Sequence, residues 1–281
     1  GAASTQEDNY FGKVGSLDGS AEKRGSVPAS FLYGSMIKLV VPKYAEEVDD
    51  QTYLDFTYKY WGASGIAGVW AEENTREAIY DALRRKETFA TSGTRIKVRF
   101  FASYDLADVS LDDQELVENA YQIGATMGGN LQASDDRQPT FLTWAVADPN
   151  TAKLQRVQII KGWLDNDGNA QQKVIDVAGN ANNGASVDIN TCEASGEGYA
   201  QLCSVWQDPE FNQAENAWYY ARAVENPSCR WSQHICIAKQ VDCASPETIG
   251  EGLEGCCSDA HKPVIQERAW SSPIWYTPSE G

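Results

Sequence analysis

The chain has 281 residues, of which 42% are hydrophobic, and its formal net charge is −17 at pH 7. This length and composition can bury one large core or two modest ones, which excludes a disordered tail. The acidity disfavours nucleic acid as a partner, because phosphate binding rests on clustered Lys and Arg. The longest apolar runs, such as residues 36–41, are far shorter than the roughly 20 residues that cross a bilayer. No membrane span is therefore expected.

The first 30 residues are rich in Gly, Ser and charge, and they are expected to be extended. They lack the basic start and the apolar stretch of a signal peptide, so export, where it occurs, is expected to be directed by residues outside this sequence.

The first informative segment is the apolar run at 66–71, which is typical of a buried strand. A helix is predicted directly after it, with Asn74 as N-cap and Glu77 completing a capping-box-like pair. The basic residues 84–86 suit the negative end of that helix. Its expected apolar face consists of Ala78, Ile79, Ala82 and Leu83.

The hydrophobic period changes to two after residue 88, where Ile96, Val98 and Phe100 alternate with their neighbours in a strand pattern. Short strands separated by Gly, Asn and Asp turns favour an antiparallel β-sandwich. Further strands are predicted at 140–147, 156–164, 173–178, 217–225 and 264–270.

All seven cysteines lie after residue 190, at long and irregular spacings without a C-x-x-C pair. This pattern favours disulfides in an oxidising compartment over a zinc site, so the protein is expected to be periplasmic or secreted. A bridged loop between Cys192 and Cys203 is expected, and the odd count leaves at least one thiol free or paired with another chain. The remaining candidates leave the connectivity open: Cys229 with Cys236, and Cys243 with Cys256 or Cys257.

Two ligand motifs are weak. Residues 165–169 resemble the start of a calcium loop, but Ala170 stands where an EF-hand needs Gly, so a hairpin turn is the simpler interpretation. Residues 250–255 fit G-x-G-x-x-G, yet they lie between cysteines instead of between a strand and a helix, which disfavours a dinucleotide site.

Only two histidines occur, His234 and His261, and both lie in the cysteine-rich region. Asp259 and His261 resemble a metal-binding Asp-x-His pair, but a surface role is expected because no other histidine supports them. A Ser-His-Asp triad is not expected either, since the chain has no G-x-S-x-G nucleophile elbow.

Tryptophan and tyrosine are abundant in the second half of the chain. Aromatic rings stack on sugar rings, which makes a carbohydrate-binding sandwich one interpretation. Core packing between two sheets is the alternative, and it is favoured because residues 217–222 place aromatic rings on both faces of a strand. The aromatic residues concerned are Trp144, Trp163, Trp206, Trp218, Tyr219, Tyr220, Trp231, Trp270, Trp275 and Tyr276.

The segment 65–95, which reads GIAGVWAEENTREAIYDALRRKETFATSGTR, resembles a bacterial family of unknown function related to the PHP (polymerase and histidinol phosphatase) metallohydrolases. The resemblance extends over almost the whole chain. Further matching segments are 7–13, 121–131, 157–165, 217–222 and 266–278.

The resemblance implies an α+β protein. Residues 1–95 would be the C-terminal portion of a PHP-like α/β barrel, and residues 96–281 an antiparallel β-sandwich. The cysteine-rich insertion at 229–257 departs from the family pattern. Family members look about twice as long, with His-rich metal motifs in an N-terminal half that would precede Gly1. The intact protein would then hydrolyse a small-molecule ester or phosphoester with zinc, manganese or iron ions. This chain alone would be inactive, would hold no metal and would need its missing N-terminal half as a partner.

The candidate site follows from the same resemblance, because active sites of such barrels gather at the C-terminal ends of the strands. Glu72 and Glu73, directly after the first predicted strand, are the candidate catalytic residues, which would orient a metal-bound water or a histidine ligand. Asn74, Arg76 and Arg95 are candidate substrate-binding residues, the arginines for an anionic group. The alternative for this segment is a capping box with a salt bridge.

A second function class stays open beside the hydrolase. A non-catalytic aromatic β-domain would bind glycan or a cell-surface partner by itself, whereas a hydrolase fragment would be inert without its other half.

Overall fold

A computed structural model describes residues 27–28, 31–42, 45–48, 51–54, 65–106, 109–111, 115–134, 137–165, 167–245, 247, 249–250, 253–257 and 261–278. Apart from residues 27–28, the extended segment predicted at 1–30 lies outside these residues. The chain forms two compact units. The first comprises residues 1–65, 187–194 and 228–265, and the second comprises residues 66–186, 195–227 and 266–281.

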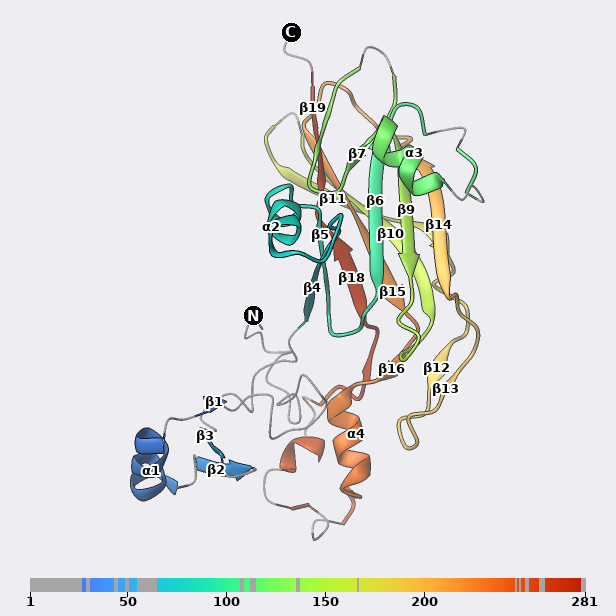
Figure 1. The fold of residues 1–281 in the computed structure, drawn as a ribbon. Helices are drawn as coiled ribbons and strands as arrows, with labels where there is room; N and C mark the ends of the chain where they lie inside the picture. The colour runs from blue at the N-terminus through green and yellow to red at the C-terminus, as the bar shows by residue number, and fades with distance from the viewer. Residues whose placement is uncertain are drawn as a thin grey trace. The chain divides into compact units, whose positions relative to one another are not determined.

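The second unit contains a large antiparallel sheet with the strand order β11-β10-β15-β18-β5-β4 (Figure 1). A further strand, β19, pairs antiparallel with β15 and parallel with β8. The sheet consists of β4 (Ile66–Val69), β5 (Thr88–Thr91), β8 (Asn130–Gln132), β10 (Leu154–Leu164), β11 (Ala170–Gly179), β15 (Ala217–Glu225), β18 (Arg268–Ser271) and β19 (Ile274–Thr277).

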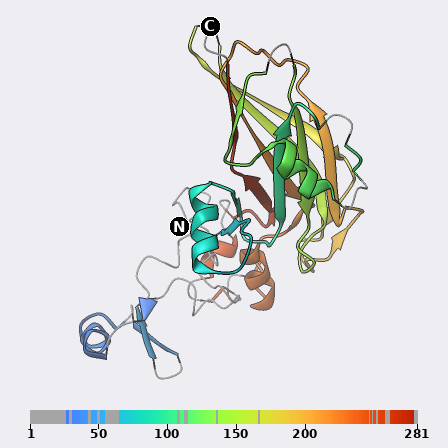
Figure 2. The same ribbon diagram turned by 45° about the horizontal axis from the view of Figure 1, so that its top comes forward.

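A smaller antiparallel sheet of order β14-β9-β6-β7 lies against it, and the two layers are seen in Figure 2. Its strands are β6 (Lys97–Ser103), β7 (Ala125–Thr126), β9 (Thr140–Val146) and β14 (Gln201–Gln207). The main core lies between the sheets, where the rings of Phe141 and Tyr219 approach to 4.3 Å between centroids. The predicted antiparallel β-structure is thereby confirmed for the second half of the chain.

Two helices belong to this unit, α2 (Arg76–Arg84) and α3 (Leu116–Ile123). Helix α3 covers the outer face of the smaller sheet, where Leu116 and Ala120 pack against Phe101 and Leu142. This second contact explains why strand β6 carries large apolar side chains on both faces, since Phe100 points into the inter-sheet core and Phe101 lies under the helix.

The α/β barrel predicted for residues 1–95 is not found among the described residues. Such a barrel needs parallel strands, each followed by a helix. Strands β4 and β5 instead pair antiparallel with each other, and β5 pairs antiparallel with β18 of the sandwich. The strand–helix–strand order around α2 matches a barrel segment in sequence, but the chain returns in the opposite direction. β4, α2 and β5 therefore lie in the same unit as the sandwich.

Three local predictions are corrected. Thr75, not Asn74, is the N-cap of α2, and its Oγ1 accepts a hydrogen bond from the backbone N–H of Ala78 at 3.3 Å. Leu83, placed on the apolar face of this helix, is half exposed. The strand expected over 264–270 is divided into two short strands, β17 (Val264–Ile265) and β18, in different sheets.

The first unit contains short elements and all three disulfides. An antiparallel sheet consists of the strands β1 (Val27–Pro28), β2 (Ala45–Val48) and β3 (Gln51–Leu54). In the sequence, the helix α1 (Phe31–Val40) comes between β1 and β2. Further along the chain come β16 (Ser228–Cys229), which pairs with β17, helix α4 (Trp231–Ala238) and the 3₁₀ helix η4 (Glu254–Cys257). A separate two-stranded sheet joins β12 (Ser186–Val187) to β13 (Ala194–Ser195).

The disulfides join Cys192 to Cys229, Cys236 to Cys256, and Cys243 to Cys257. Cys203 is the free thiol. The expected loop between Cys192 and Cys203 and the pair of Cys229 with Cys236 are therefore wrong, because Cys203 lies on strand β14, packed beside α3. The expected partner of Cys243 is confirmed as Cys257, one of the two alternatives. Among the described residues, no helix is both long and apolar enough to span a bilayer.

Candidate functional site

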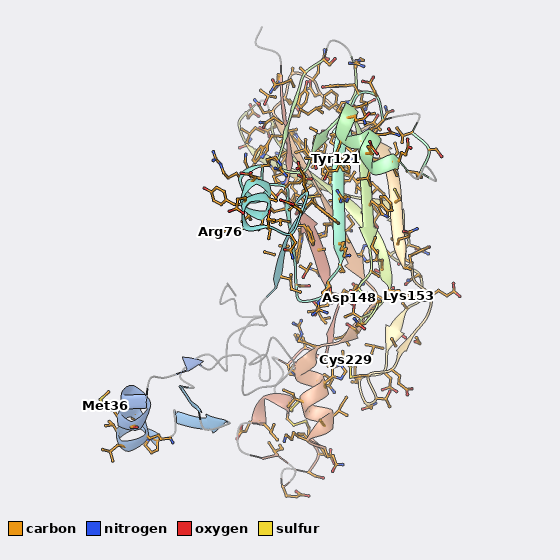
Figure 3. The ribbon with its side chains drawn as sticks, in the orientation of Figure 1. Met36, Arg76, Tyr121, Asp148, Lys153 and Cys229 are labelled. Atoms are coloured by element: carbon orange, nitrogen blue, oxygen red, sulfur yellow. A yellow bond between two sulfur atoms is a disulfide. The ribbon has the colours of Figure 1, made fainter. Side chains whose placement is uncertain are left out.

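The predicted catalytic residues lie on one exposed turn. Glu72, Glu73 and Asn74 are solvent exposed between β4 and α2, and Arg76 is the first residue of that helix (Figure 3). The Thr75 hydroxyl donates a hydrogen bond to Glu73 Oε1 at 3.0 Å. The structure thus places four of the predicted site residues side by side along the chain, while their proposed chemical roles stay predictions.

Arg95 lies in the connection between β5 and β6, with its side chain exposed. Its backbone N–H donates to Asp148 Oδ2 at 2.9 Å, in the connection after β9 (Figure 3). Within the described part of the chain, no recorded contact joins Arg95 to the turn at 72–76.

One group of three potential metal ligands occurs among the described residues. The sulfur atoms of Cys192 and Cys229 and a ring nitrogen of His234 lie within 4.8 Å of one another, the only such group of three in the described part of the chain. The two sulfurs form a disulfide, however, and a metal ligand must be a thiolate. The second histidine is held by a hydrogen bond between His261 Nε2 and Gln233 Oε1 at 2.9 Å, and burial lowers the pKa of His261.

The calcium-like segment is a hairpin turn. It joins β10 to β11, as the simpler interpretation of the sequence predicted. Asp165 Oδ1 accepts hydrogen bonds from the backbone N–H groups of Asp167 and Asn169, and Oδ2 accepts from the side-chain amide of Gln171. These bonds lower the pKa of Asp165. Both carboxylate oxygens of Asp165 thus accept hydrogen bonds from within the hairpin.

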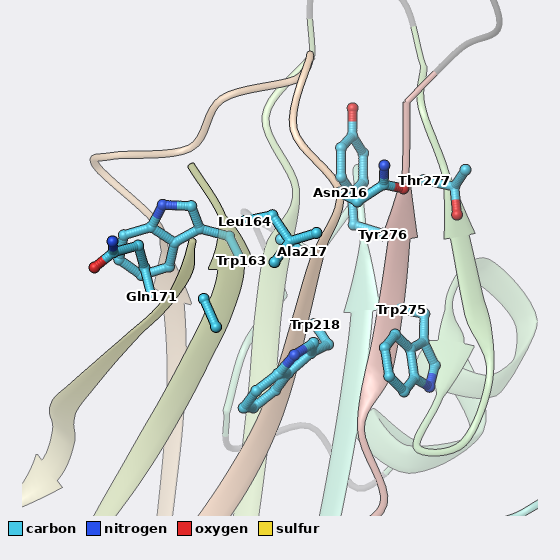
Figure 4. A pocket seen from close by; sticks show the side chains of 10 residues that line it. Trp163, Leu164, Gln171, Asn216, Ala217, Trp218, Trp275, Tyr276 and Thr277 are labelled. Carbon is cyan, nitrogen blue, oxygen red and sulfur yellow. The ribbon is translucent and has the colours of Figure 1, made fainter. Parts of the chain in front are cut away.

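A pocket with a volume of about 380 Å³ lies at one end of the larger sheet. Three indole rings line it, and Figure 4 shows those of Trp218 and Trp275 in the lower part of the view and that of Trp163 at the left. The amide groups of Gln171 and Asn216 and the hydroxyl of Thr277 supply polar atoms around these rings. The residues that line the pocket are Trp163, Leu164, Ala170, Gln171, Asn216, Ala217, Trp218, Trp275, Tyr276 and Thr277.

Strand register places Trp218 and Trp275 in one cross-strand row. Trp218 on β15 pairs with Gly162 on β10 and with Trp275 on β19, which in turn pairs with Asn130 on β8. Tyr219, the next residue along β15, is fully buried in the inter-sheet core. Side chains alternate between the faces of a strand, so Trp218 and Trp275 lie on the outer face of the larger sheet.

Gly162 allows the indole of Trp218 to lie flat on the sheet. A Cβ atom at residue 162 would meet the Trp218 ring at 2.1 Å, so any side chain there would displace the ring. The ring of Tyr220 continues the layer, stacked on Trp218 with an interplanar angle of 11° and 5.7 Å between centroids. Trp275 remains 44% exposed. The result is a flat aromatic surface beside the pocket.

The sequence pointed to these aromatic residues without separating their roles. Their presence on both faces of β15 favoured core packing, which holds for Tyr219 but not for Trp218, because Trp218 lies on the outer face of the sheet. The signal that identifies the outer face is Gly162, a glycine in the interior of a strand, because such a glycine marks a close approach by another group.

Asp208 and Glu225 are buried acidic residues elsewhere in the sandwich. Asp208 Oδ2 accepts hydrogen bonds from Lys161 Nζ at 2.5 Å and from the Tyr219 hydroxyl at 2.8 Å. Glu225 Oε1 accepts a hydrogen bond from the Thr151 hydroxyl at 2.8 Å, whereas Oε2 has no hydrogen-bond partner among the described residues. Burial raises the pKa of Glu225 to about 7, and the hydrogen bond from Thr151 works in the opposite direction.

The fold and this surface define a protein with a disulfide-bonded first unit and an antiparallel β-sandwich as its second unit. The chain belongs to the family described as protein of unknown function (DUF3604), whose family model matches residues 1–278. No curated protein and no solved structure matches the chain. Membership of an uncharacterised family is thus confirmed, and the relation to the PHP hydrolases stays a prediction.

Proposed function

We propose that the second unit binds a carbohydrate chain on the outer face of its larger sheet. The observation that carries this proposal is the cross-strand pair Trp218 and Trp275, whose side chains line a pocket of about 380 Å³. This is the glycan-binding alternative that the aromatic composition suggested.

Exposed tryptophan is the main physical support. Leaving an indole in water forfeits roughly 25 cal/mol for every Å² of apolar surface that burial would remove from solvent. Trp275 is 44% exposed, and it lies beside the partly exposed Trp218 on a rigid sheet. The apolar C–H face of a pyranose ring covers such a surface while its hydroxyl groups stay hydrated at the ring edge, which suits a flat aromatic platform.

Polar groups at the rim support the same ligand. Binding sites combine apolar walls with a few placed polar groups that fix orientation. The Gln171 amide is held by its hydrogen bond to Asp165. Asn216 and Thr277 add hydrogen-bonding atoms beside the rings. These groups match the hydroxyls of a sugar better than they match a fully apolar ligand.

The experiment is titration calorimetry of the whole chain against soluble polysaccharides, beginning with dextran and its derivatives. Trp275→Ala and Trp218→Ala are expected to weaken binding at least tenfold. Tyr80→Ala is the matched control, since Tyr80 is an aromatic residue on α2 that is 60% exposed and lies outside the pocket. Equal affinity of wild type and Trp275→Ala would overturn the proposal.

A secreted or periplasmic location is part of this proposal. Three disulfides in one small unit are typical of proteins that fold in an oxidising compartment, where extracellular polysaccharides are also met.

The hydrolase is the second candidate, favoured by the contiguous exposed turn that carries Glu72, Glu73, Asn74 and Arg76. In this proposal the zinc, manganese or iron ions belong to residues outside this sequence, and the turn contacts an ester or phosphoester substrate. Glu72→Gln and Glu73→Gln in a longer, metal-loaded protein are then expected to lower kcat at least tenfold without changing thermal stability. Unchanged kcat in both variants would remove the turn from the reaction.

A further inference from the structure

We propose that the carbohydrate is anionic, and that its sulfate or carboxylate groups bind to a cluster of three arginines, Arg156, Arg222 and Arg268, on the same sheet face. This inference rests on the proposed carbohydrate binding and names the class of polysaccharide.

Strand register brings the three arginines together around one buried residue. Val224 on β15 is 1% exposed, and it pairs with Arg156 on one side and with Arg268 on the other. Strands lie roughly 4.8 Å apart, so the backbones of Arg156 and Arg268 are separated by about 10 Å across Val224. Arg222 lies two residues before Val224 on β15 and therefore on the same face.

The cluster has only one acidic counterpart within ion-pair distance in the described chain. Asp176 lies on β11, and its Oδ1 is 3.6 Å from Arg156 Nε. The same oxygen accepts a hydrogen bond from Gln158 at 2.6 Å, and Gln158 Oε1 accepts from Arg222 Nε at 2.8 Å. Among the described residues, neither Arg222 nor Arg268 forms an ion pair.

An excess of positive charge at this place is unusual for a protein with a net charge of −17. Like charges held close together repel, and the repulsion is strongest where burial limits screening by water. Burial and the neighbouring guanidinium groups of Arg268 and Arg156 all lower the pKa of Arg222. A bound anion relieves this repulsion, and the planar guanidinium fork matches two oxygens of a sulfate or carboxylate group.

The arginine cluster continues the aromatic surface. Trp218, Tyr220 and Arg222 follow one another on the outer face of β15, and Trp270 on β18 pairs with Arg222. The five residues from Trp218 to Arg222 make four steps along the strand, a span of roughly 13 Å. A polysaccharide that runs along β15 can stack one sugar on Trp218 and present a charged substituent to the arginines. A free small anion would use the arginines without the tryptophans.

The test compares three polymers with one backbone: dextran, dextran sulfate and carboxymethyl dextran. Titration calorimetry with the whole chain is expected to show at least tenfold tighter binding of a charged polymer than of dextran, with an affinity that falls as salt rises. The comparison between dextran sulfate and carboxymethyl dextran identifies sulfate or carboxylate as the preferred group. Arg222→Gln and Arg268→Gln are each expected to weaken binding of the charged polymer at least fivefold and to leave dextran binding unchanged.

Arg84→Gln is the matched control, because Arg84 is an exposed arginine on α2, away from the sheet face. Equal binding of dextran and both charged polymers, unaffected by Arg222→Gln, would overturn the anionic ligand and leave the carbohydrate proposal intact. Charged-polymer binding that needs Arg222 but not Trp275 would support the anion site and overturn the aromatic platform. If Arg84→Gln and Arg222→Gln weakened binding of the charged polymer equally, the effect would come from the overall charge of the protein. That result would overturn the arginine site. Absence of binding to all three polymers would overturn both proposals.

Discussion

The indole of Trp218 lies against the backbone of Gly162 on the neighbouring strand, so closely that a single added Cβ atom would meet the ring at 2.1 Å. The two residues are direct partners in the register of β10 and β15. The flatness of the aromatic face therefore depends on a residue without a side chain, and the same residue couples the stability of the sheet to the shape of the proposed binding surface.

Gly162→Val is expected to tilt the Trp218 ring off the sheet, which would weaken polysaccharide binding as strongly as Trp218→Ala. The displaced ring would also destabilise the fold by about 1 to 3 kcal/mol, as overpacking does. Calorimetry and urea unfolding of the same variant measure the two effects. Gly250→Ala is the control, because a methyl group there would meet only the flexible side chain of Leu253, at 3.3 Å. A Gly162→Val protein with wild-type affinity would show that ring orientation is irrelevant to binding.

A second prediction concerns Glu225, which is fully buried at the end of β15. Burial and the nearby carboxylates of Glu267 and Asp148 raise its pKa from the ordinary 4.5 to about 7, against the hydrogen bond from Thr151. The folded state therefore binds a proton more tightly than the unfolded state does. Its contribution to stability is fully present below pH 4.5 and is lost as the pH rises through 7.

Glu225→Gln removes the titrating group and keeps its shape. At pH 8 the variant is expected to be more stable than the wild type by about 3 kcal/mol, from the pKa difference, while near pH 4.5 the two should match. Urea unfolding at both pH values measures the difference. Glu118→Gln, at an exposed position on α3, should show no such pH-dependent gain. An equal effect of Glu225→Gln at both pH values would contradict the raised pKa.

The sequence predicts individual strands of the sandwich well, for a local reason. The alternation of Ile96, Val98 and Phe100 records one buried face, and the structure places β6 there. The direction in which β5 returns after α2 is not local. Parallel and antiparallel returns need the same strand–helix–strand pattern, and the pairing of β5 with β18 joins residues about 180 positions apart. The resemblance to a barrel segment therefore predicted the strand–helix–strand order of β4, α2 and β5, but it did not predict that the strands pair antiparallel.

The candidate site shows the same limit. The cross-strand row of Gly162, Trp218 and Trp275 is formed by residues of three strands. The spacing of these residues in the sequence therefore does not predict that they are neighbours. The predicted pairing of Cys192 was wrong for the same reason. Cys192 bonds to Cys229, 37 residues away, instead of to Cys203, which is nearer in the sequence. The pairing of Cys243 with Cys257, which are only 14 residues apart, was among the alternatives that the sequence predicted.

A third prediction concerns Cys203, the free cysteine. Burial raises the pKa of Cys203 to about 11, so at pH 8 only about one molecule in a thousand carries the thiolate that reacts. A disulfide-exchange reagent is expected to find almost no reactive thiol in the native protein, one after denaturation, and seven after denaturation and reduction. Cys203→Ser should remove the single thiol and leave the other six unchanged. Two or more thiols in the denatured, unreduced protein would contradict the three disulfides.

The buried ion pair of Lys161 and Asp208 gives the last prediction. Their side chains are only 5% and 4% exposed, and the Lys161 Nζ atom lies 2.5 Å from Asp208 Oδ2. Breaking a buried pair by removing one partner typically costs 3 to 5 kcal/mol, roughly, because the other charge stays buried without compensation. Lys161→Met is therefore expected to lower the free energy of unfolding by about that amount.

The double variant Lys161→Met with Asp208→Asn separates charge from packing. It leaves no uncompensated charge, and the new amide oxygen can still accept the hydrogen bond from Tyr219. It should therefore be more stable than Lys161→Met alone. Lys173→Met is the control, because Lys173 pairs with Glu210 at 2.6 Å with both side chains exposed, and an exposed pair contributes at most about 1 kcal/mol. Urea unfolding of the wild type and these three variants measures the differences in stability. A double variant less stable than Lys161→Met would mean that the ion pair stabilises the sandwich by its geometry and not by the cancellation of charge.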